Sequence, residues 1–164
     1  MMKTLKSIKQ LYPYQFEGKN IGLSIARGWL PEFAELCKTI DELLGDNKRG
    51  FHWVQLKEKF GSARYYWSTK GKKDSLRFDL IAPSEVVSME VRQPVSANQQ
   101  QALFERISKV VGAAEAHTNK HCIVCGAPGK IDQKDGYVLV LCDLHAKQRL
   151  GGGDLGIWPP DEDE

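Results

Sequence analysis

Residues 121–145 read HCIVCGAPGKIDQKDGYVLVLCDLH, and this stretch decides how the end of the chain folds. Cys122, Cys125, Cys142 and His145 stand in it with the spacing C-x2-C-x16-C-x2-H. Two pairs of ligands, each separated by two residues, can supply the tetrahedral set of thiolates and imidazole that zinc prefers. The sequence therefore predicts one zinc ion bound by these four residues.

His121 is a less favoured candidate for the fourth ligand, and iron is a less favoured candidate for the ion. His121 adjoins Cys122, and adjacent residues rarely reach one ion at good angles, so His145 is the better fourth ligand. Iron can occupy similar sulfur sites, but the imidazole favours zinc. The fourth cysteine, Cys37, lies on the apolar stripe of a helical pattern, which indicates a buried thiol.

The ligand set predicts a structural rather than a catalytic ion. Four protein ligands close the coordination sphere, whereas a catalytic zinc keeps one position for water. A zinc deaminase would need an H-x-E sequence before its cysteines. A treble-clef nuclease would need catalytic histidines on the hairpin between the two ligand pairs, within residues 126–141. Both features are absent, as are the usual nucleophile and phosphate-loop patterns, so we predict that the protein is not an enzyme.

The residues between and after the ligands predict a small zinc module. Gly126 allows a tight turn after the first pair, and residues 130–132 and 137–141 can form a hairpin. The second pair begins a helix that continues through Leu150. The tight turn that carries the first ligand pair is a zinc knuckle. A knuckle followed by a hairpin and a helix is the order of a treble clef, and a ribbon-like arrangement with a second knuckle in place of the helix is the alternative.

Residues before this module alternate between helical and strand-like patterns, which predicts an α+β protein. The expected elements are a helix at 31–44, strands at 51–56 and 63–68 joined by a loop at 57–61, strands at 78–82 and 86–91, and a helix at 97–116. We therefore predict an α+β body at 1–117 made of helices and antiparallel hairpins, a zinc-binding module at 118–153 packed on it, and an acidic tail at 154–164.

Charge and hydropathy restrict where the protein acts. The 23 Lys and Arg residues exceed the 21 Asp and Glu residues by two. Five of the acids lie after Gly153, which leaves 16 acids and a net charge of +7 in residues 1–153. The sequence has no apolar run of about 20 residues and no secretory signal, so we expect no membrane partner.

A basic cluster surrounds the first predicted hairpin. Its members are Lys57, Lys59, Arg64, Lys70, Lys72 and Lys73, and they lie among Phe60, Tyr65, Tyr66 and Trp67. Basic side chains beside exposed aromatic rings can bind nucleic acid through phosphate contacts and base stacking. The same composition would arise if the rings were in the core and the lysines were solvated.

Four blocks of sequence stand out: GWL at 28–30, KEKFGSARYY at 57–66, CIVCGAPG at 122–129 and LCDLH at 141–145. Together they resemble a family of uncharacterised small proteins encoded by bacteriophages and prophages. In this family a Lys-Phe-Gly motif precedes an arginine and an aromatic residue, and here Ser62 and Ala63 stand between glycine and arginine.

The resemblance implies a phage or mobile-element origin and a location in the bacterial host cytoplasm. We expect a non-enzymatic, zinc-stabilised binding protein that engages a host or phage protein, with an anti-defence or host-takeover role as one form of that activity. The alternative is a nucleic-acid-binding regulator that uses the basic and aromatic hairpin region.

Overall fold

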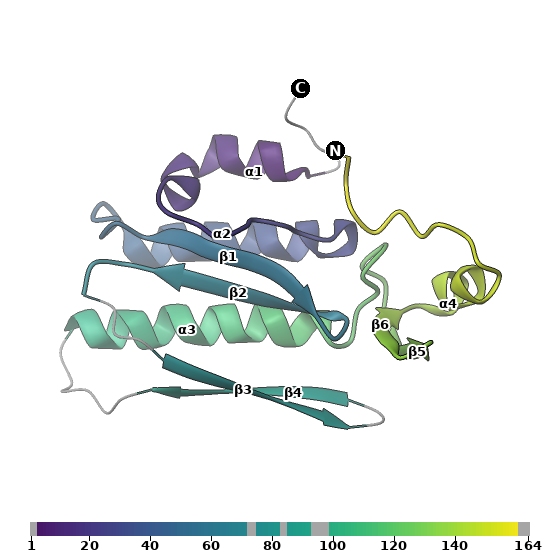
Figure 1. The fold of residues 1–164 in the computed structure, drawn as a ribbon. Coiled ribbons are helices and arrows are strands. Elements are labelled where there is room, and N and C mark those ends of the chain that lie inside the picture. The colour runs from purple at the N-terminus through teal and green to yellow at the C-terminus, as the bar shows by residue number, and fades with distance from the viewer. Residues whose placement is uncertain (1–2, 72–74, 83–84, 93–98, 161–164) are drawn as a thin grey trace.

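The computed structural model describes residues 3–71, 75–82, 85–92 and 99–160 and shows a mixture of helices and antiparallel hairpins (Figure 1). The elements are α1 (Leu5–Leu11), η1 (Pro13–Phe16), η2 (Arg27–Trp29), α2 (Leu30–Leu44), β1 (His52–Lys59), β2 (Ser62–Ser68), β3 (Ser75–Ala82), β4 (Glu85–Arg92), α3 (Gln99–Thr118), β5 (Lys130–Lys134), β6 (Tyr137–Leu141) and α4 (Asp143–Leu150). The predicted α+β class is confirmed.

Helix α2 forms almost where the sequence predicts it. Pro31 lies in its first turn, where a missing N–H costs nothing, and Gly45 ends it with a positive φ of 63°. The apolar positions form one buried face that includes Phe33 and Cys37. This face packs on the β1–β2 hairpin, where the Phe33 ring lies 5.3 Å from Trp53 and 5.1 Å from Tyr65 between centroids.

The β1–β2 hairpin is longer than the sequence analysis predicts. Residues 57–59 continue β1 instead of forming a loop, and they pair in register with residues 62–64 of β2. The turn consists of Phe60 and Gly61 alone, with φ angles of 54° and 81°. Positive φ at both central residues matches the twist of the two strands, so the strands pair up to the turn.

Helix α3 protects the outer edge of β2. The Tyr65 N–H donates to Glu115 Oε1 at 3.0 Å, and the Ala63 N–H donates to Thr118 Oγ1 at 2.9 Å. No further strand among the described residues pairs with β2 on this edge, and these two side chains accept hydrogen bonds from the N–H groups that such a strand would satisfy. The first two residues of the helix predicted at 97–116 lie outside the described residues.

The second predicted strand pair forms β3 and β4, which pair with each other through all eight residues of each strand. Figure 1 shows this hairpin on the far side of α3 from β2. It shows β5, β6 and α4 at the end of the molecule where α3 finishes.

The C-terminal region shares one hydrophobic core with the body. Ile123 and Leu141 are buried in the same cluster as Trp29, Phe33 and Trp53. Two glycines permit the contact. Gly28 leaves no room for a Cβ against the backbone of Cys122 and Ile123, and a Cβ at Gly61 would lie 2.8 Å from the Cα of Leu139.

The segment after α4 returns to the body. The Arg27 N–H donates to the Ile157 carbonyl at 2.8 Å, and Leu155 and Ile157 pack against the core. The first part of the predicted acidic tail is therefore in contact with the body, and residues 161–164 lie outside the described residues. Among the described helices, none has both the length and the apolar character needed to cross a bilayer.

Candidate metal centre

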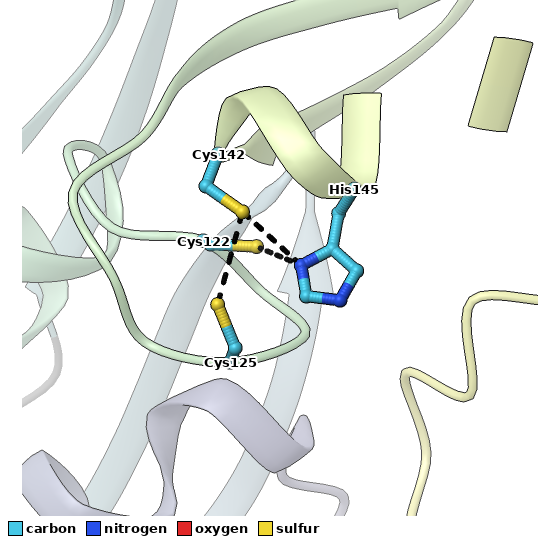
Figure 2. Close-up of side chains that lie close together, drawn as sticks. All are labelled: Cys122, Cys125, Cys142 and His145. Atoms are coloured by element: carbon cyan, nitrogen blue, oxygen red, sulfur yellow. Dashed lines mark hydrogen bonds between the residues drawn. The ribbon is translucent and has the colours of Figure 1, made fainter. Parts of the chain in front are cut away.

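The four predicted ligands come together at one point (Figure 2). The Nδ1 atom of His145 lies 3.4 Å from Cys122 Sγ and 3.2 Å from Cys142 Sγ. Cys125 Sγ lies 3.8 Å from Cys142 Sγ, and all four potential ligand atoms lie within 4.8 Å of one another. The cysteines are free thiols, because 3.8 Å is far longer than a disulfide bond.

These separations fit a tetrahedral zinc ion. Zinc lies about 2.3 Å from sulfur and about 2.0 Å from nitrogen, so tetrahedral ligand atoms stand about 3.5 to 3.8 Å apart. The measured distances of 3.2, 3.4 and 3.8 Å are close to those values. Three thiolates, one neutral imidazole and Zn²⁺ would carry a net charge of −1.

The first ligand pair lies on a tight turn that precedes β5. The Gly126 N–H donates to the Cys122 carbonyl at 2.8 Å, and the Cys122 N–H donates to the Ala127 carbonyl at 2.7 Å. Gly126 has a φ of 78°, which a residue with a side chain adopts only with strain. The turn brings Cys125 back beside Cys122, with Cys122 completely buried and Cys125 exposed.

The second pair lies at the start of α4. Cys142 is the residue before the first turn, and its carbonyl accepts the Ala146 N–H at 2.9 Å. The i, i+3 spacing then places His145 on the same side of the helix as Cys142. The backbone N–H of His145 lowers the pKa of the Cys142 thiol, which favours the thiolate form that binds metal.

His121 contacts His117 instead of the four clustered ligands. Its Nδ1 lies 2.8 Å from the carbonyl oxygen of His117, and the two imidazole rings stack with centroids 3.6 Å apart. The cluster in the described part of the chain contains His145 and excludes His121, as the adjacency argument predicts.

Arg149 was not singled out in the sequence, yet it joins α4 to the β5–β6 hairpin. Its Nη1 donates to Asp132 Oδ1 at 2.6 Å and to the Asp132 carbonyl at 2.8 Å, and its Nη2 donates to the Tyr137 carbonyl at 2.7 Å. Lys134 Nζ donates in return to the Arg149 carbonyl at 2.9 Å. An arginine near a helix end is common in sequences, so only the fold reveals these partners.

The predicted basic cluster does not form one surface. Lys57 and Lys59 lie near the turn of the β1–β2 hairpin, while Lys70 follows β2 at the opposite end, about 20 Å away at the rise of an extended strand. Lys72 and Lys73 lie outside the described residues.

Arg64 departs from the expected exposed surface. Its side chain is only 2% exposed, and its Nη1 donates to Ser62 Oγ and to the Ala63 carbonyl, each at 2.9 Å. Tyr65 and Trp67 are also buried in the core, so they add no exposed aromatic ring to the outer surface of the hairpin. Phe60 and Tyr66 remain partly exposed.

Comparison with models of known protein families, with curated protein sequences and with solved structures finds no match for the chain. The likeness to phage-encoded proteins therefore stays a prediction. The geometry alone supports a metal site made of three cysteines and one histidine.

Proposed function

We propose that the protein is a non-enzymatic, zinc-stabilised binding protein that engages a host or phage protein. The observation that carries this proposal is that the ligand site adjoins the hydrophobic core. Cys122 is completely buried, and its neighbour Ile123 belongs to the core that also contains Trp29. Four ligands would fill a tetrahedral ion, so the metal would support a surface rather than activate water.

Helix α4 is the surface that the metal would hold in place. None of its eight residues, all of which are described, is buried. Leu144 is 70% exposed and Leu150 is 80% exposed. The Cys142–His145 pair anchors one end of the helix and Arg149 the other, so these two leucines have fixed positions from which they could contact a partner protein.

The arrangement also supports one finer proposal, the treble clef. The order of knuckle, β5–β6 hairpin and α4, with the second ligand pair at the start of α4, favours the treble clef over the ribbon. A phage origin, a bacterial cytoplasmic location and an anti-defence or host-takeover role rest on the sequence resemblance.

Co-purification from bacterial cells tests the function. We expect the tagged protein to retain a stoichiometric protein partner, and the Leu144→Asp variant to lose that partner while keeping its zinc. Lys147→Asp, on the same helix, is the matched control for added negative charge. A partner that binds all three proteins equally would place the contact away from Leu144, and the absence of any stoichiometric partner would contradict the proposal.

The nucleic-acid alternative is supported by a smaller surface than the sequence suggests. Lys57 Nζ lies 5.5 Å from the ring centroid of Tyr66, and Lys59 Nζ lies 5.4 Å from that of Phe60. Filter binding to DNA and RNA across a salt series tests it. Affinity that falls steeply with salt supports the regulator, because phosphate contacts release counterions, and no binding at low salt contradicts it.

A further inference from the structure

A cavity of about 470 Å³ lies among β2, β4 and α3 of the body. Its walls come from β2, β4 and α3, and Ile131 and Val140 of the β5–β6 hairpin close one side. A volume of this size falls within the range of small-molecule sites, about 300 to 1,000 Å³. The cavity is separate from the metal ligands, none of which lines it.

A glycine in the middle of α3 leaves the cavity open. Gly112 lines the cavity, and a Cβ built on it meets no atom within 4 Å. Glycine inside a helix costs about 1 kcal/mol relative to alanine. Gly112 is itself exposed, and Ser108 and Ala116, one turn away on either side, are not buried, so the cavity opens to solvent along this face of α3. A side chain at this position would extend into the empty space.

The lining combines aromatic faces with hydrogen-bonding groups of both kinds. Phe60 and Tyr66 offer rings at the hairpin turn and on β2, while Ser108 and Asn119 lie on α3 with the spacing of one helical face. Buried Arg64 and Glu115 also line the wall. A flat, polar heterocycle suits this lining better than a purely apolar ligand, because both its faces and its edges find partners.

Lysines lie where the aromatic rings reach the surface, and one exposed carboxylate, Glu90, also lines the cavity. Lys120 lines the cavity and is exposed, and Lys57 and Lys59 lie over the rings of Tyr66 and Phe60. An aromatic, hydrogen-bonding cavity with lysines at its rim matches the chemistry of a nucleotide, with a base for the interior and a phosphate for the rim.

We propose that this cavity binds one nucleotide, with the base beside Tyr66 and Gly112 and the phosphate near Lys57, Lys59 and Lys120. The ligand would be either a free nucleotide or one unit of a single strand, since both present the same base and phosphate. This site is independent of a protein contact on α4, and it gives the nucleic-acid alternative a definite ligand.

The test uses the zinc-loaded full chain and two substitutions at one position. Binding of a labelled oligonucleotide of about ten residues is followed by fluorescence anisotropy, and binding of nucleoside monophosphates by calorimetry. Gly112→Leu fills the cavity, whereas Gly112→Ala adds one methyl group and is the matched control. Both residues favour helix more than glycine does, so both variants should fold, which circular dichroism and melting temperature verify.

We expect Gly112→Leu to weaken binding at least about tenfold, the order of one lost base-stacking contact, while Gly112→Ala binds within a few-fold of the native protein. Binding of monophosphates as well as oligonucleotide would identify a free-nucleotide site; binding of oligonucleotide alone would identify a strand. Equal binding by all three proteins would overturn the cavity proposal and leave a surface-binding regulator. No binding of either ligand would overturn both.

Discussion

The body and the C-terminal region differ in what stabilises each of them. In the body, α2, α3 and the β1–β2 hairpin surround a core of large side chains that includes Phe33, Trp53 and Tyr65, each no more than 2% exposed. In the C-terminal region, α4 buries no residue and β5 is half-exposed. Apart from residues 122–124 and 139–141 this small unit buries little apolar surface, so a bound metal ion would add stability that its own packing does not supply.

The environments of Cys37 and Cys142 show the same difference between the two regions. Cys37 lies in the body core, where burial raises the pKa of its thiol and keeps it neutral. Cys142 caps α4, where the N–H of His145 lowers the thiol pKa. A thiol in the first setting contributes packing, and a thiol in the second is prepared to bind a metal ion.

Removing a metal ligand should have the largest effect. We expect Cys142→Ser to lower the free energy of unfolding by at least about 3 kcal/mol, because metal binding and folding of this region are coupled. Cys37→Ser is the control: it changes packing in the body but should keep one zinc ion per chain. Elemental analysis and thermal unfolding measure both. Unchanged thermal stability after complete chelation of the native protein would show that the metal does not hold the fold.

A substitution at the contact between the two regions should have the next largest effect. Gly28→Ala forces a Cβ against the backbone of Cys122 and Ile123, which cannot move without displacing a ligand. Overpacking costs about 1–3 kcal/mol, and we expect the upper end. Gly151→Ala is the control, since its Cβ would lie at an ordinary 3.6 Å from its nearest neighbour. Equal stability of the two variants in denaturant titrations would mean that the regions are not tightly docked.

Loss of the Arg149 hydrogen bonds should affect only the C-terminal region. We expect Arg149→Met to cost about 1–3 kcal/mol, the value of hydrogen bonds made by a charged group, because Asp132 and the Tyr137 carbonyl lose their donor. Lys147→Met, at an exposed position of the same helix, should be nearly neutral. Hydrogen exchange should increase in β5, β6 and α4 but not in α2; a uniform increase would contradict a local role.

The smallest effect should come from an ion pair on the body. Asp41 Oδ1 accepts a hydrogen bond from Lys48 Nζ at 2.8 Å and another from Tyr14 at 2.8 Å, and these bonds lower the carboxyl pKa. The stabilisation is therefore present above the unfolded pKa of about 3.9 and disappears as the pH falls through the lower, folded value.

We expect Asp41→Asn to cost less than about 1 kcal/mol at neutral pH, because both side chains are about one-third exposed. The difference in melting temperature between the native protein and the variant should shrink as the pH is lowered toward 3. A difference that stays constant with pH would show that the carboxylate charge is not responsible. Any loss of bound metal in acid would affect both proteins alike, so the difference between them reports on the body alone.

Local signals in the sequence predicted most of the elements and the metal ligands. Proline and glycine bounded α2, an apolar stripe identified its buried face, and ligand spacing identified Cys122, Cys125, Cys142 and His145. These features depend on neighbours along the chain, whose geometry is set by the helix and turn periodicities. The extent of β1 was missed, because pairing across the hairpin, rather than the polar residues at 57–59, decides where that strand ends.

The sequence alone determined the α+β composition and the four residues that can hold a metal ion. Only the tertiary structure decided which side chains are buried, which charged groups lie together and where a cavity forms. It buried Arg64, separated Lys57 and Lys59 from Lys70, brought Arg149 to Asp132, and opened a cavity beside Gly112. The physical reason is distance along the chain: ligand pairs and helix faces arise from residues a few positions apart, whereas burial and surface charge depend on segments that meet only when the whole core forms.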